Sequence, residues 1–373
     1  MARVKLEDVC ERGSSNLKQS DVVDKDGDYP IYGASGYIGN VDFYHQEQPY
    51  VAVVKDGAGI GRTTLHPAKS SVIGTMQYLL PKGNVLPEYL CYVVKYMHLE
   101  KYFTGATIPH IYFKDYKNEE FNLDSLDRQK EIVSTLNKIE KVIESRTKEL
   151  ELLDELIRAR FVEMFGNPDV NEKNWNVYKM EQLCEVGSSK RIYQNDQSLT
   201  GIPFLRNSDL VNRMDTGSKD CDLFIPEELF EKFKKQGLVP ARGDILLTAR
   251  GTLGRCYIIQ DDDEFYFQDG MITWLSKFDE KITPLYISYL FEMPEFRKQI
   301  DSLQAGSTVA YLSISMTKEL NVMVPPLELQ NQFAAFVAQT DKSKFDIHKF
   351  LYCTSNNTQS IIKPRPNTKE SGK

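Results

Sequence analysis

The sequence lacks the features that define several large classes of protein. No apolar run reaches the ~18 residues that a membrane-spanning helix requires, and residues 1–8 contain no apolar segment of the kind found in a secretory signal. The six cysteines are far apart and none belongs to a C-x-x-C pair, while the five histidines have no metal-ligand spacing. We therefore expect a cytoplasmic protein with reduced thiols, no metal ion and no membrane segment.

Catalytic signatures are absent as well. The glycine-rich segment 57–63 differs from a Walker A loop in its spacing and has Arg62 where that motif requires lysine, so it predicts a tight hairpin. No strand-linked G-x-G-x-x-G precedes a distal acid, which disfavours a fold that binds a dinucleotide or S-adenosylmethionine. Pro168-Asp169 with Glu172-Lys173 weakly resembles a nuclease pattern, but it directly follows a helix stop and predicts an ordinary loop. The sequence thus predicts no catalytic residue.

The composition is that of a folded protein with a modest excess of acidic residues. The 373 residues are 41% apolar and include 53 Asp and Glu against 46 Lys and Arg, a formal charge of −7. This balance argues against a protein that coats nucleic acid through bulk charge, but it leaves room for a local basic surface.

The chain contains two copies of one domain. Residues 5–15, KLEDVCERGSS, and residues 179–189, KMEQLCEVGSS, are identical at seven of eleven positions. The correspondence continues in the same order, for instance at Gly61-Arg62 and Gly254-Arg255. The offset grows from 174 to 201, so the second copy is 27 residues longer. Two copies are too few for a solenoid, so we expect a duplicated globular domain.

Each copy has the same order of expected elements. These are a strand, a helical segment and a second strand, at 50–54, 87–103 and 120–123 in the first copy and at 244–248, 284–303 and 321–324 in the second. Strands and helices that do not alternate strictly predict the α+β class.

A long helix follows the first copy. From residue 126 to 165, apolar side chains recur at the a and d positions of about five heptads, and Gly166-Asn167-Pro168 ends the pattern. At ~1.5 Å per residue the helix is ~60 Å long, and its apolar stripe requires a partner helix. The helix-pairing residues predicted here are Ile132, Leu136, Ile139, Ile143, Leu150, Leu153 and Ile157.

The partner helix is expected after the second copy. Gln330 corresponds to Gln129 of the first helix, and the same register places Phe333 and Val337 on the pairing face. This stripe is weaker, and the polar run 353–358 predicts that the helix ends near Tyr352. The predicted organisation is a domain at 1–124, a helix at 125–167, a domain at 168–324, a short helix at 325–353 and a disordered tail at 354–373.

These features together resemble the specificity (S) subunits of type I restriction–modification systems. The resemblance extends from Lys5 to about Lys344 and depends on the order of domain, long helix, domain and helix. Segments similar to the family are 126–133, LDRQKEIV, 243–255, GDILLTARGTLGR, and 324–330, VPPLELQ. Each segment alone is weakly specific, whereas their order and duplication are strongly specific.

The resemblance implies two target recognition domains, related by a pseudo-two-fold and separated by two antiparallel helices. Each domain would read one half of a split, asymmetric sequence in double-stranded DNA. The helices would dock two methyltransferase (modification) subunits, and restriction subunits would complete the complex. The chain itself would be no enzyme and hold no cofactor, because S-adenosylmethionine would bind to the modification subunit and ATP to the restriction subunit. A ~60 Å spacer would place half-sites one to two turns of DNA apart, at about 34 Å per turn.

Residues that contact DNA are expected on loops between strands, because Arg and Lys bind phosphate and guanine while Asn and Gln bind adenine. The loops 104–112 and 304–311 contain small residues that suit close approach to a backbone. Base-reading residues should differ between the copies, so the insertion-rich stretch 190–213 is a predicted specificity element. The predicted DNA-binding residues are Lys55, Arg62, His66, His110, Lys190, Arg191, Arg206, Asn207, Arg250, Arg255 and Tyr311.

Two alternatives are open on the sequence alone. A fused enzyme that cleaves and methylates DNA would need a methylase motif and a nuclease core, and the sequence contains neither. A coiled-coil adaptor that binds other proteins is compatible with the acidic charge. Salt-dependent DNA binding would distinguish the DNA reader from the adaptor.

Overall fold

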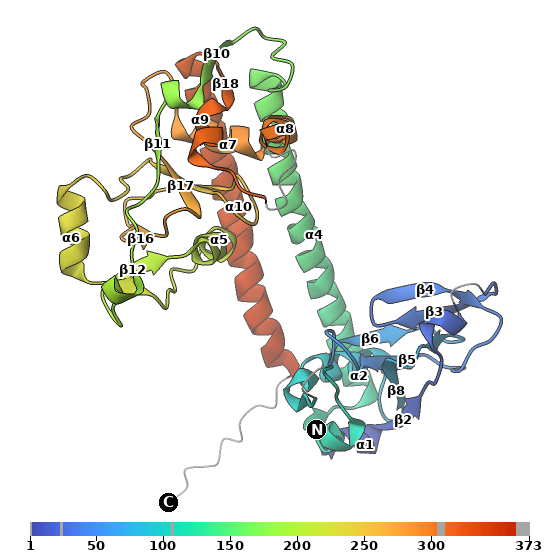
Figure 1. Cartoon of the computed structure of the whole chain (residues 1–373). Helices are drawn as coiled ribbons and strands as arrows, with labels where there is room; N and C mark the ends of the chain where they lie inside the picture. Colours follow the sequence, from blue (N-terminus) through green and yellow to red (C-terminus); the bar gives the residue numbers. More distant parts are fainter. Residues whose placement is uncertain (1, 23–24, 106–107, 304–309, 363–373) are drawn as a thin grey trace, which may run out of the picture. The chain divides into compact units, whose positions relative to one another are not determined.

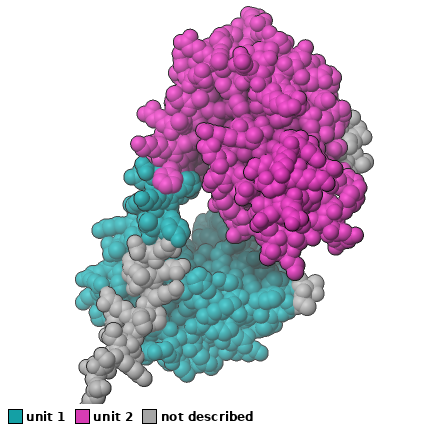
Figure 2. Space-filling view, turned by 90° about the vertical axis from the view of Figure 1, so that its left-hand side faces the viewer, with its two compact units in different colours: residues 1–148, 346–373 teal, residues 149–345 magenta. Residues whose placement is uncertain are grey.

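The computed structural model describes residues 2–22, 25–105, 108–303 and 310–362, with side chains up to residue 354. The chain (Figure 1) divides into two compact units, residues 1–148 with 346–373 and residues 149–345 (Figure 2). Each unit contains one globular domain and one end of each long helix, α4 (Leu126–Phe165) and α10 (Leu327–Ile362).

Three sheets form the first domain. β1 (Ala2–Lys5) pairs antiparallel with β9 (Glu120–Leu123), so the first and last strands close the domain. The other two sheets have the strand orders β2-β8-β5-β6 and β4-β3-β7. Their strands are β2 (Cys10–Ser14), β3 (Tyr29–Gly33), β4 (Gly36–Val41), β5 (Tyr50–Val54), β6 (Thr63–His66), β7 (Ser71–Val72) and β8 (Met76–Pro81).

The inner strand β5 is buried along its whole length. Val51 and Val53 pack on one face, in the same apolar cluster as Leu90 of α2 (Pro87–Lys95). Ala52 and Val54 belong to a second cluster on the opposite face. This alternation follows from the two-residue period of a strand, and it makes β5 a rigid support for the loop that follows it.

The second domain repeats this arrangement strand for strand. β10 (Asn176–Lys179) pairs with β18 (Asn321–Val324), as β1 does with β9. The other sheets have the orders β11-β17-β14-β15 and β13-β12-β16, and β12 runs parallel to β16 as β3 does to β7. Their strands are β11 (Glu185–Gly187), β12 (Ile202–Leu205), β13 (Phe224–Ile225), β14 (Ile245–Thr248), β15 (Cys256–Ile258), β16 (Tyr266–Phe267) and β17 (Ile272–Ser276). The predicted duplication and the α+β class are confirmed.

Within the described residues, the longer second copy contains two helices with no counterpart in the first. α5 (Asn207–Thr216) lies between β12 and β13, where the first domain has the tight turn between β3 and β4. α6 (Glu227–Lys235) lies between β13 and β14 (Figure 1). The two copies therefore differ most around the three-stranded sheet.

The predicted helical segments 87–103 and 284–303 are each interrupted. The first comprises α2 and a 3-10 turn, Leu99–Tyr102, separated by His98 in the left-handed region at φ 51°. The second comprises α7 (Pro284–Glu292) and α8 (Pro294–Leu303). Pro294 separates them because proline has no N–H to continue the helical hydrogen bonds. The described chain also contains three short α-helices, α1 (Leu6–Val9), α3 (Phe113–Tyr116) and α9 (Ile314–Glu319).

A buried glutamine joins each long helix to its own domain. In α4, Gln129 Oε1 accepts the N–H of Leu86 at 2.9 Å, and Nε2 donates to the carbonyls of Asn84 and Asp124. Gln330 repeats this in α10: it accepts the N–H of Thr283 at 2.8 Å and donates to the carbonyls of Lys281 and Pro325. Both side chains are at most 1% exposed, so the start of each helix is fixed to its domain.

The second long helix is longer than the sequence indicates. α10 continues to Ile362, nine residues beyond the predicted end at 353, so the expectation of a short helix at 325–353 is wrong. Low helix propensity in the run 353–358 is a weak signal, and extending an existing helix by one residue costs far less than starting one. The predicted tail at 354–373 is helical up to Ile362, and residues 363–373 lie outside the described residues.

Within residues 149–345, α4 and α10 pair in antiparallel fashion. Ile157, Phe333 and Val337 belong to one buried cluster. The ring of Phe161 lies 5.5 Å from that of Phe333, and Arg160 lies over the ring of Phe336, at 5.8 Å. The side chains of Asp154 and Lys344 form an ion pair at 2.5 Å. Residues later in α10 thus contact residues earlier in α4, as antiparallel helices require.

The first two predicted pairing residues have a different role. Ile132 and Leu136 are buried in the cluster of the first domain, which includes Leu6 and Tyr89, so their prediction as helix-pairing residues is wrong. The fixed start of α4 turns this part of the stripe toward the domain. The remaining pairing candidates, Ile139, Ile143, Leu150 and Leu153, are half-buried.

In the described residues, no helix combines the length and apolarity needed to cross a membrane.

Candidate nucleic-acid interface

Equivalent hairpins follow the inner strands β5 and β14. The N–H of Val54 donates to the carbonyl of Arg62, and that of Thr248 to the carbonyl of Arg255. Gly61 and Gly254 have φ angles of 82° and 73°, which a side chain disfavours. The Gly-Arg pair common to both copies therefore holds the hairpin.

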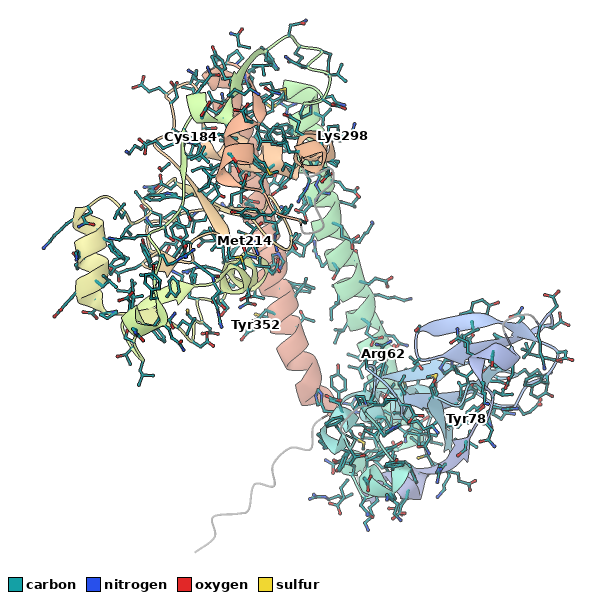
Figure 3. All side chains as sticks on the ribbon, in the orientation of Figure 1. Arg62, Tyr78, Cys184, Met214, Lys298 and Tyr352 are labelled. Carbon is teal, nitrogen blue, oxygen red and sulfur yellow. The ribbon has the colours of Figure 1, made fainter. Side chains whose placement is uncertain are left out.

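The arginines of these two pairs are both held by acceptors. Arg62 (Figure 3) is exposed, and its guanidinium donates to the carbonyl of Ala34 at 2.9 Å. Arg255 pairs with Asp215 of α5 at 2.6 Å, which lowers the pKa of that carboxyl. Contact with DNA would have to share or replace these interactions, so both stay predictions of phosphate contacts.

His66 is not available for DNA. Its side chain is 6% exposed, its ring lies 4.4 Å from that of Tyr32 and 5.4 Å from that of Tyr50, and Nε2 lies 2.7 Å from Thr64 Oγ1. Burial lowers the pKa of His66 to about 4. The prediction of His66 as a DNA contact is wrong, because the aromatic side chains of neighbouring strands enclose the ring.

The structure brings together His110 and a residue that the sequence did not single out, Asp56. Nδ1 of His110 lies 2.6 Å from Asp56 Oδ1, and the side chains are 37% and 30% exposed. Their backbones form an antiparallel bridge beyond the end of β5. Lys55 Nζ lies 3.8 Å from Asp56 Oδ2, so the three side chains form one polar group.

The second domain has Arg250 and Tyr311 at the same place. Their backbones also form an antiparallel bridge, and the guanidinium carbon of Arg250 lies 4.8 Å from the centroid of the Tyr311 ring. Asn207 Nδ2 donates to the carbonyl of Arg250 at 3.1 Å. The bridge and Asn207 thus hold the backbone of Arg250, and the Tyr311 ring lies against its exposed side chain.

The remaining candidates lie in the inserted stretch. Lys190 Nζ is 5.6 Å from the centroid of the Phe233 ring, and Arg191 forms an ion pair with Asp269 at 2.8 Å. Arg206 caps α5 and pairs with Asp209 and Asp222. The structure does not bring these residues into the group around Arg250, apart from Asn207. Of the two predicted loops, residues 106–107 and 304–309 lie outside the described residues.

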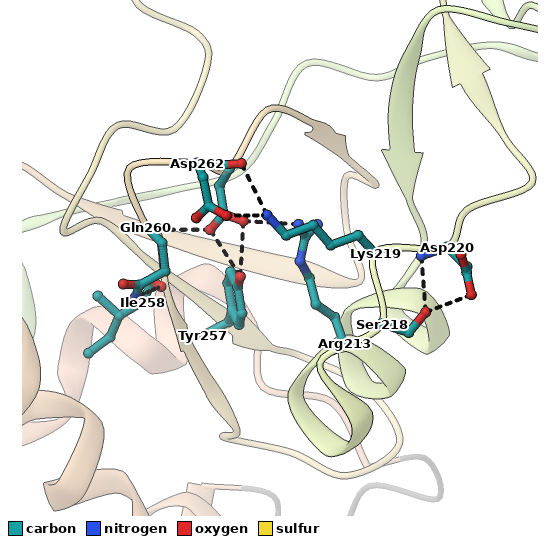
Figure 4. A network of polar contacts seen from close by, with 9 residues as sticks. Arg213, Ser218, Lys219, Asp220, Tyr257, Ile258, Gln260 and Asp262 are labelled. Carbon is teal, nitrogen blue, oxygen red and sulfur yellow. Dashed lines mark hydrogen bonds and ion pairs between the residues drawn. The ribbon is translucent and has the colours of Figure 1, made fainter. Parts of the chain in front are cut away.

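A buried ion pair ties the inserted helix α5 to the loop between β15 and β16 (Figure 4). Arg213 and Asp263 meet at 3.0 Å, with side chains 7% and 1% exposed. The guanidinium lies 4.8 Å from the ring centroid of Phe265, and the hydroxyl of Tyr257 donates to Asp263 at 2.9 Å. The insertion is thus a fixed part of the second domain.

One cluster among the described residues has ligand types that metals favour. Oxygen or sulfur atoms of Asp209, Cys221 and Asp222 lie within 4.8 Å of one another. The guanidinium of Arg206 already binds both carboxylates, at 2.8 and 2.5 Å. This cation explains the acidic cluster without a metal ion.

Sequence reasoning missed the acidic partners of the basic candidates. Asp56, Asp215 and Asp269 lie between 40 and 78 residues from His110, Arg255 and Arg191 in the chain. No spacing rule connects residues so far apart. Asp209, three residues after Arg206 at a helix start, does carry a local signal of this kind.

The fold and these surfaces define a double-domain recognition protein, in which one scaffold appears twice with different polar groups on it. The sequence matches the family described as "Type I restriction modification DNA specificity domain" over residues 1–155 and 172–352. The chain belongs to this family, and the predicted class of non-catalytic DNA specificity subunit is confirmed. The adaptor alternative finds no support.

Curated relatives and solved structures agree with this assignment. A putative type I restriction enzyme specificity subunit from Haemophilus influenzae is 26% identical over 83% of this chain and 80% of its own length. The MjaVIII specificity subunit from Methanocaldococcus jannaschii is 24% identical over 78% of this chain and 72% of its own length.

Among solved structures, the type I S subunit from M. genitalium has a TM-score of 0.56 at 15% identity and covers 98% of this chain and 96% of its own. A structure from work on complex assembly and conformational transition of the type I restriction–modification system has a TM-score of 0.57 at 13% identity, over 96% of both chains. These likenesses show a common fold.

Proposed function

We propose that each domain reads one half of a split, asymmetric sequence in double-stranded DNA. The observation that carries the proposal is that two strand-for-strand copies of one scaffold present different side chains beyond equivalent inner strands. A protein that recognises two identical half-sites would retain the same side chains in both copies. Divergence on a constant scaffold is expected when the halves of the target differ.

The proposed partners are two methyltransferase (modification) subunits and the restriction subunits of the complex, acting in the cytoplasm. Exposed apolar side chains on the long helices support docking of a protein partner there. In residues 149–345 the most exposed of these are Phe345, Leu152 and Leu156, at 67%, 51% and 49%. In this proposal S-adenosylmethionine binds to the modification subunit and ATP to the restriction subunit, while this chain supplies recognition.

The experiment is a salt titration of DNA binding by the chain co-expressed with its modification subunit. A specific duplex and a scrambled duplex of equal length and composition are compared. The proposal predicts tighter binding to the specific duplex at physiological salt, and a linear fall of log affinity with log salt. Equal affinity for both duplexes at every salt concentration would contradict it.

A further inference from the structure

Two residue pairs occupy the same place in the two domains. The N–H of Ile111 donates to the carbonyl of Lys55 at 3.0 Å, and the N–H of Leu312 donates to the carbonyl of Ala249 at 3.0 Å. The next residues along these strands form the bridges Asp56 with His110 and Arg250 with Tyr311. Backbone hydrogen bonds, independently of sequence identity, thus make the two pairs equivalent.

The support beneath the two pairs is the same. Asp56 and Arg250 follow the ends of β5 and β14, the inner strands whose residues are all buried. His110 and Tyr311 directly precede Ile111 and Leu312, which are 1% and 0% exposed. Each pair is thus partly exposed at the edge of a rigid sheet.

The hydrogen-bonding chemistry of the pairs is opposite. An ionised aspartate only accepts hydrogen bonds, and arginine only donates them. Asp56 is oriented by Nδ1 of His110, whereas the guanidinium of Arg250 lies over the ring of Tyr311 and the backbone carbonyl of Arg250 is held by Asn207. The hairpin residues that bear the scaffold, Gly61-Arg62 and Gly254-Arg255, are in contrast identical.

Arg250 also differs from the other arginines of its domain. Most of these are held by carboxylates, namely Arg191, Arg206, Arg213, Arg242 and Arg255. Within the described residues the guanidinium of Arg250 contacts an aromatic face instead, which leaves its N–H groups, in the plane of the guanidinium, to bind a ligand. An arginine whose N–H groups are left to bind a ligand can bind O6 and N7 of guanine with two parallel hydrogen bonds.

We infer that these bridged pairs are the specificity-determining positions of the two domains. Arg250, stacked on Tyr311, reads a guanine in one half of the target, and Asp56, oriented by His110, accepts from the amino group of a cytosine in the other half. The inference rests on the proposed function and assigns one base pair in each half-site to a named side chain.

The test is a map of DNA methylation in cells that express the full chain with its modification subunit. Arg250→Gln replaces a guanine reader by an adenine reader, and Asp56→Asn replaces a carboxylate by an amide. The inference predicts that each variant changes or relaxes one base pair, with a roughly 10- to 100-fold loss of preference there. The two variants must affect different halves of the motif.

Arg242→Gln is the matched control. It removes the same charge near the opposite end of β14, where Arg242 pairs with Asp261 and both side chains are over 70% exposed. It should leave both half-sites unchanged. Arg250→Lys, which keeps the charge and loses the two-fold hydrogen bond, should relax the same base pair as Arg250→Gln, so a folding defect in one variant does not decide the test.

Three results would overturn the inference while the wild-type complex still methylates a split motif. These are unchanged motifs in the Arg250 and Asp56 variants, changes in the same half, or uniform weakening at all sites, which marks a phosphate contact. If the wild-type complex recognises no split motif, the proposed function itself fails.

Discussion

At the scale of single residues, buried polar side chains are what the two copies have most clearly in common. Gln129 and Gln330 accept one backbone N–H and donate to two backbone carbonyls in the same pattern. Their correspondence was visible in the sequence, but their role was not. A heptad position predicts an apolar contact, whereas the structure uses it to fix the helix to its domain.

Gln330→Ala tests this role. It leaves Thr283 N–H and the carbonyls of Lys281 and Pro325 without their partner, so we expect a loss of about 3 kcal/mol in the free energy of unfolding. Both tryptophans, Trp175 and Trp274, lie in the second domain, so urea unfolding followed by tryptophan fluorescence reports on this domain.

The control for this substitution is Gln332→Ala, at an exposed position whose side chain donates a hydrogen bond to Glu328 of its own helix. It should shift the unfolding free energy by less than ~0.5 kcal/mol. Equal effects of the two substitutions would show that Gln330 has no special role.

His66 gives the first domain a defined pH dependence. Its pKa is lowered to about 4 by burial, against about 6.5 in an unfolded chain. Below pH 6.5, His66 therefore becomes protonated in the unfolded chain but stays neutral in the folded domain. The free energy of unfolding falls as the pH falls. From pH 7 to pH 5 we expect a loss of about 2 kcal/mol from this residue.

The measurement is hydrogen exchange of the peptide covering β5 at both pH values. His66→Phe keeps an aromatic ring beside Tyr32 and Tyr50 and should remove this part of the loss. His98→Gln, at an exposed histidine, should retain it. A loss that persists unchanged in His66→Phe would assign it to other groups.

At the scale of elements, the long helices follow the heptad pattern only in part. The pattern predicted the position of α4, but not that Ile132 and Leu136 pack into the first domain. It also placed the end of α10 too early, because the residue types in a segment do not show that the segment packs against another helix, here α4. Arg146 of α4 lies over the ring of Phe350, at 5.9 Å, close to the run that the sequence predicted to be non-helical.

Phe333 and Phe345 separate two roles along one helix. Phe333 is fully buried, with its ring 5.5 Å from that of Phe161 and 5.3 Å from that of Tyr289, so Phe333→Ala should cost about 3–5 kcal/mol in tryptophan-monitored unfolding. Phe345 is 67% exposed, so Phe345→Ala should leave stability within ~0.5 kcal/mol. The same variant should weaken co-purification of the modification subunit, and undiminished assembly would remove Phe345 from the docking surface.

The candidate site was less predictable than the fold. Repetition of short segments predicted the duplicated domain, because strands, turns and helix starts have local signals. Which basic side chains are available depends on acids distant in sequence, as for Arg255 with Asp215. Asp56 and Arg250 are each followed by a glycine in the sequence, but their bridges to His110 and Tyr311 are set by the fold.

At the scale of the whole molecule, the charge of −7 takes on a specific meaning. Many basic side chains are neutralised by nearby carboxylates, so general attraction to the DNA backbone is weak in this chain alone. We expect partner subunits to supply much of the non-specific affinity for DNA, while the two bridged pairs, Asp56 with His110 and Arg250 with Tyr311, supply selectivity. The long helices, ~60 and ~54 Å by their residue numbers, suit half-sites one to two turns apart.

The central claim is that one chain reads two different half-sites. The most direct measurement is the position of methylated bases across a genome in which the wild-type chain and its modification subunit are expressed together. We expect a single motif with two unlike specified halves and an unspecified gap of fixed length. A continuous motif, a palindrome, or methylation without sequence preference would contradict it.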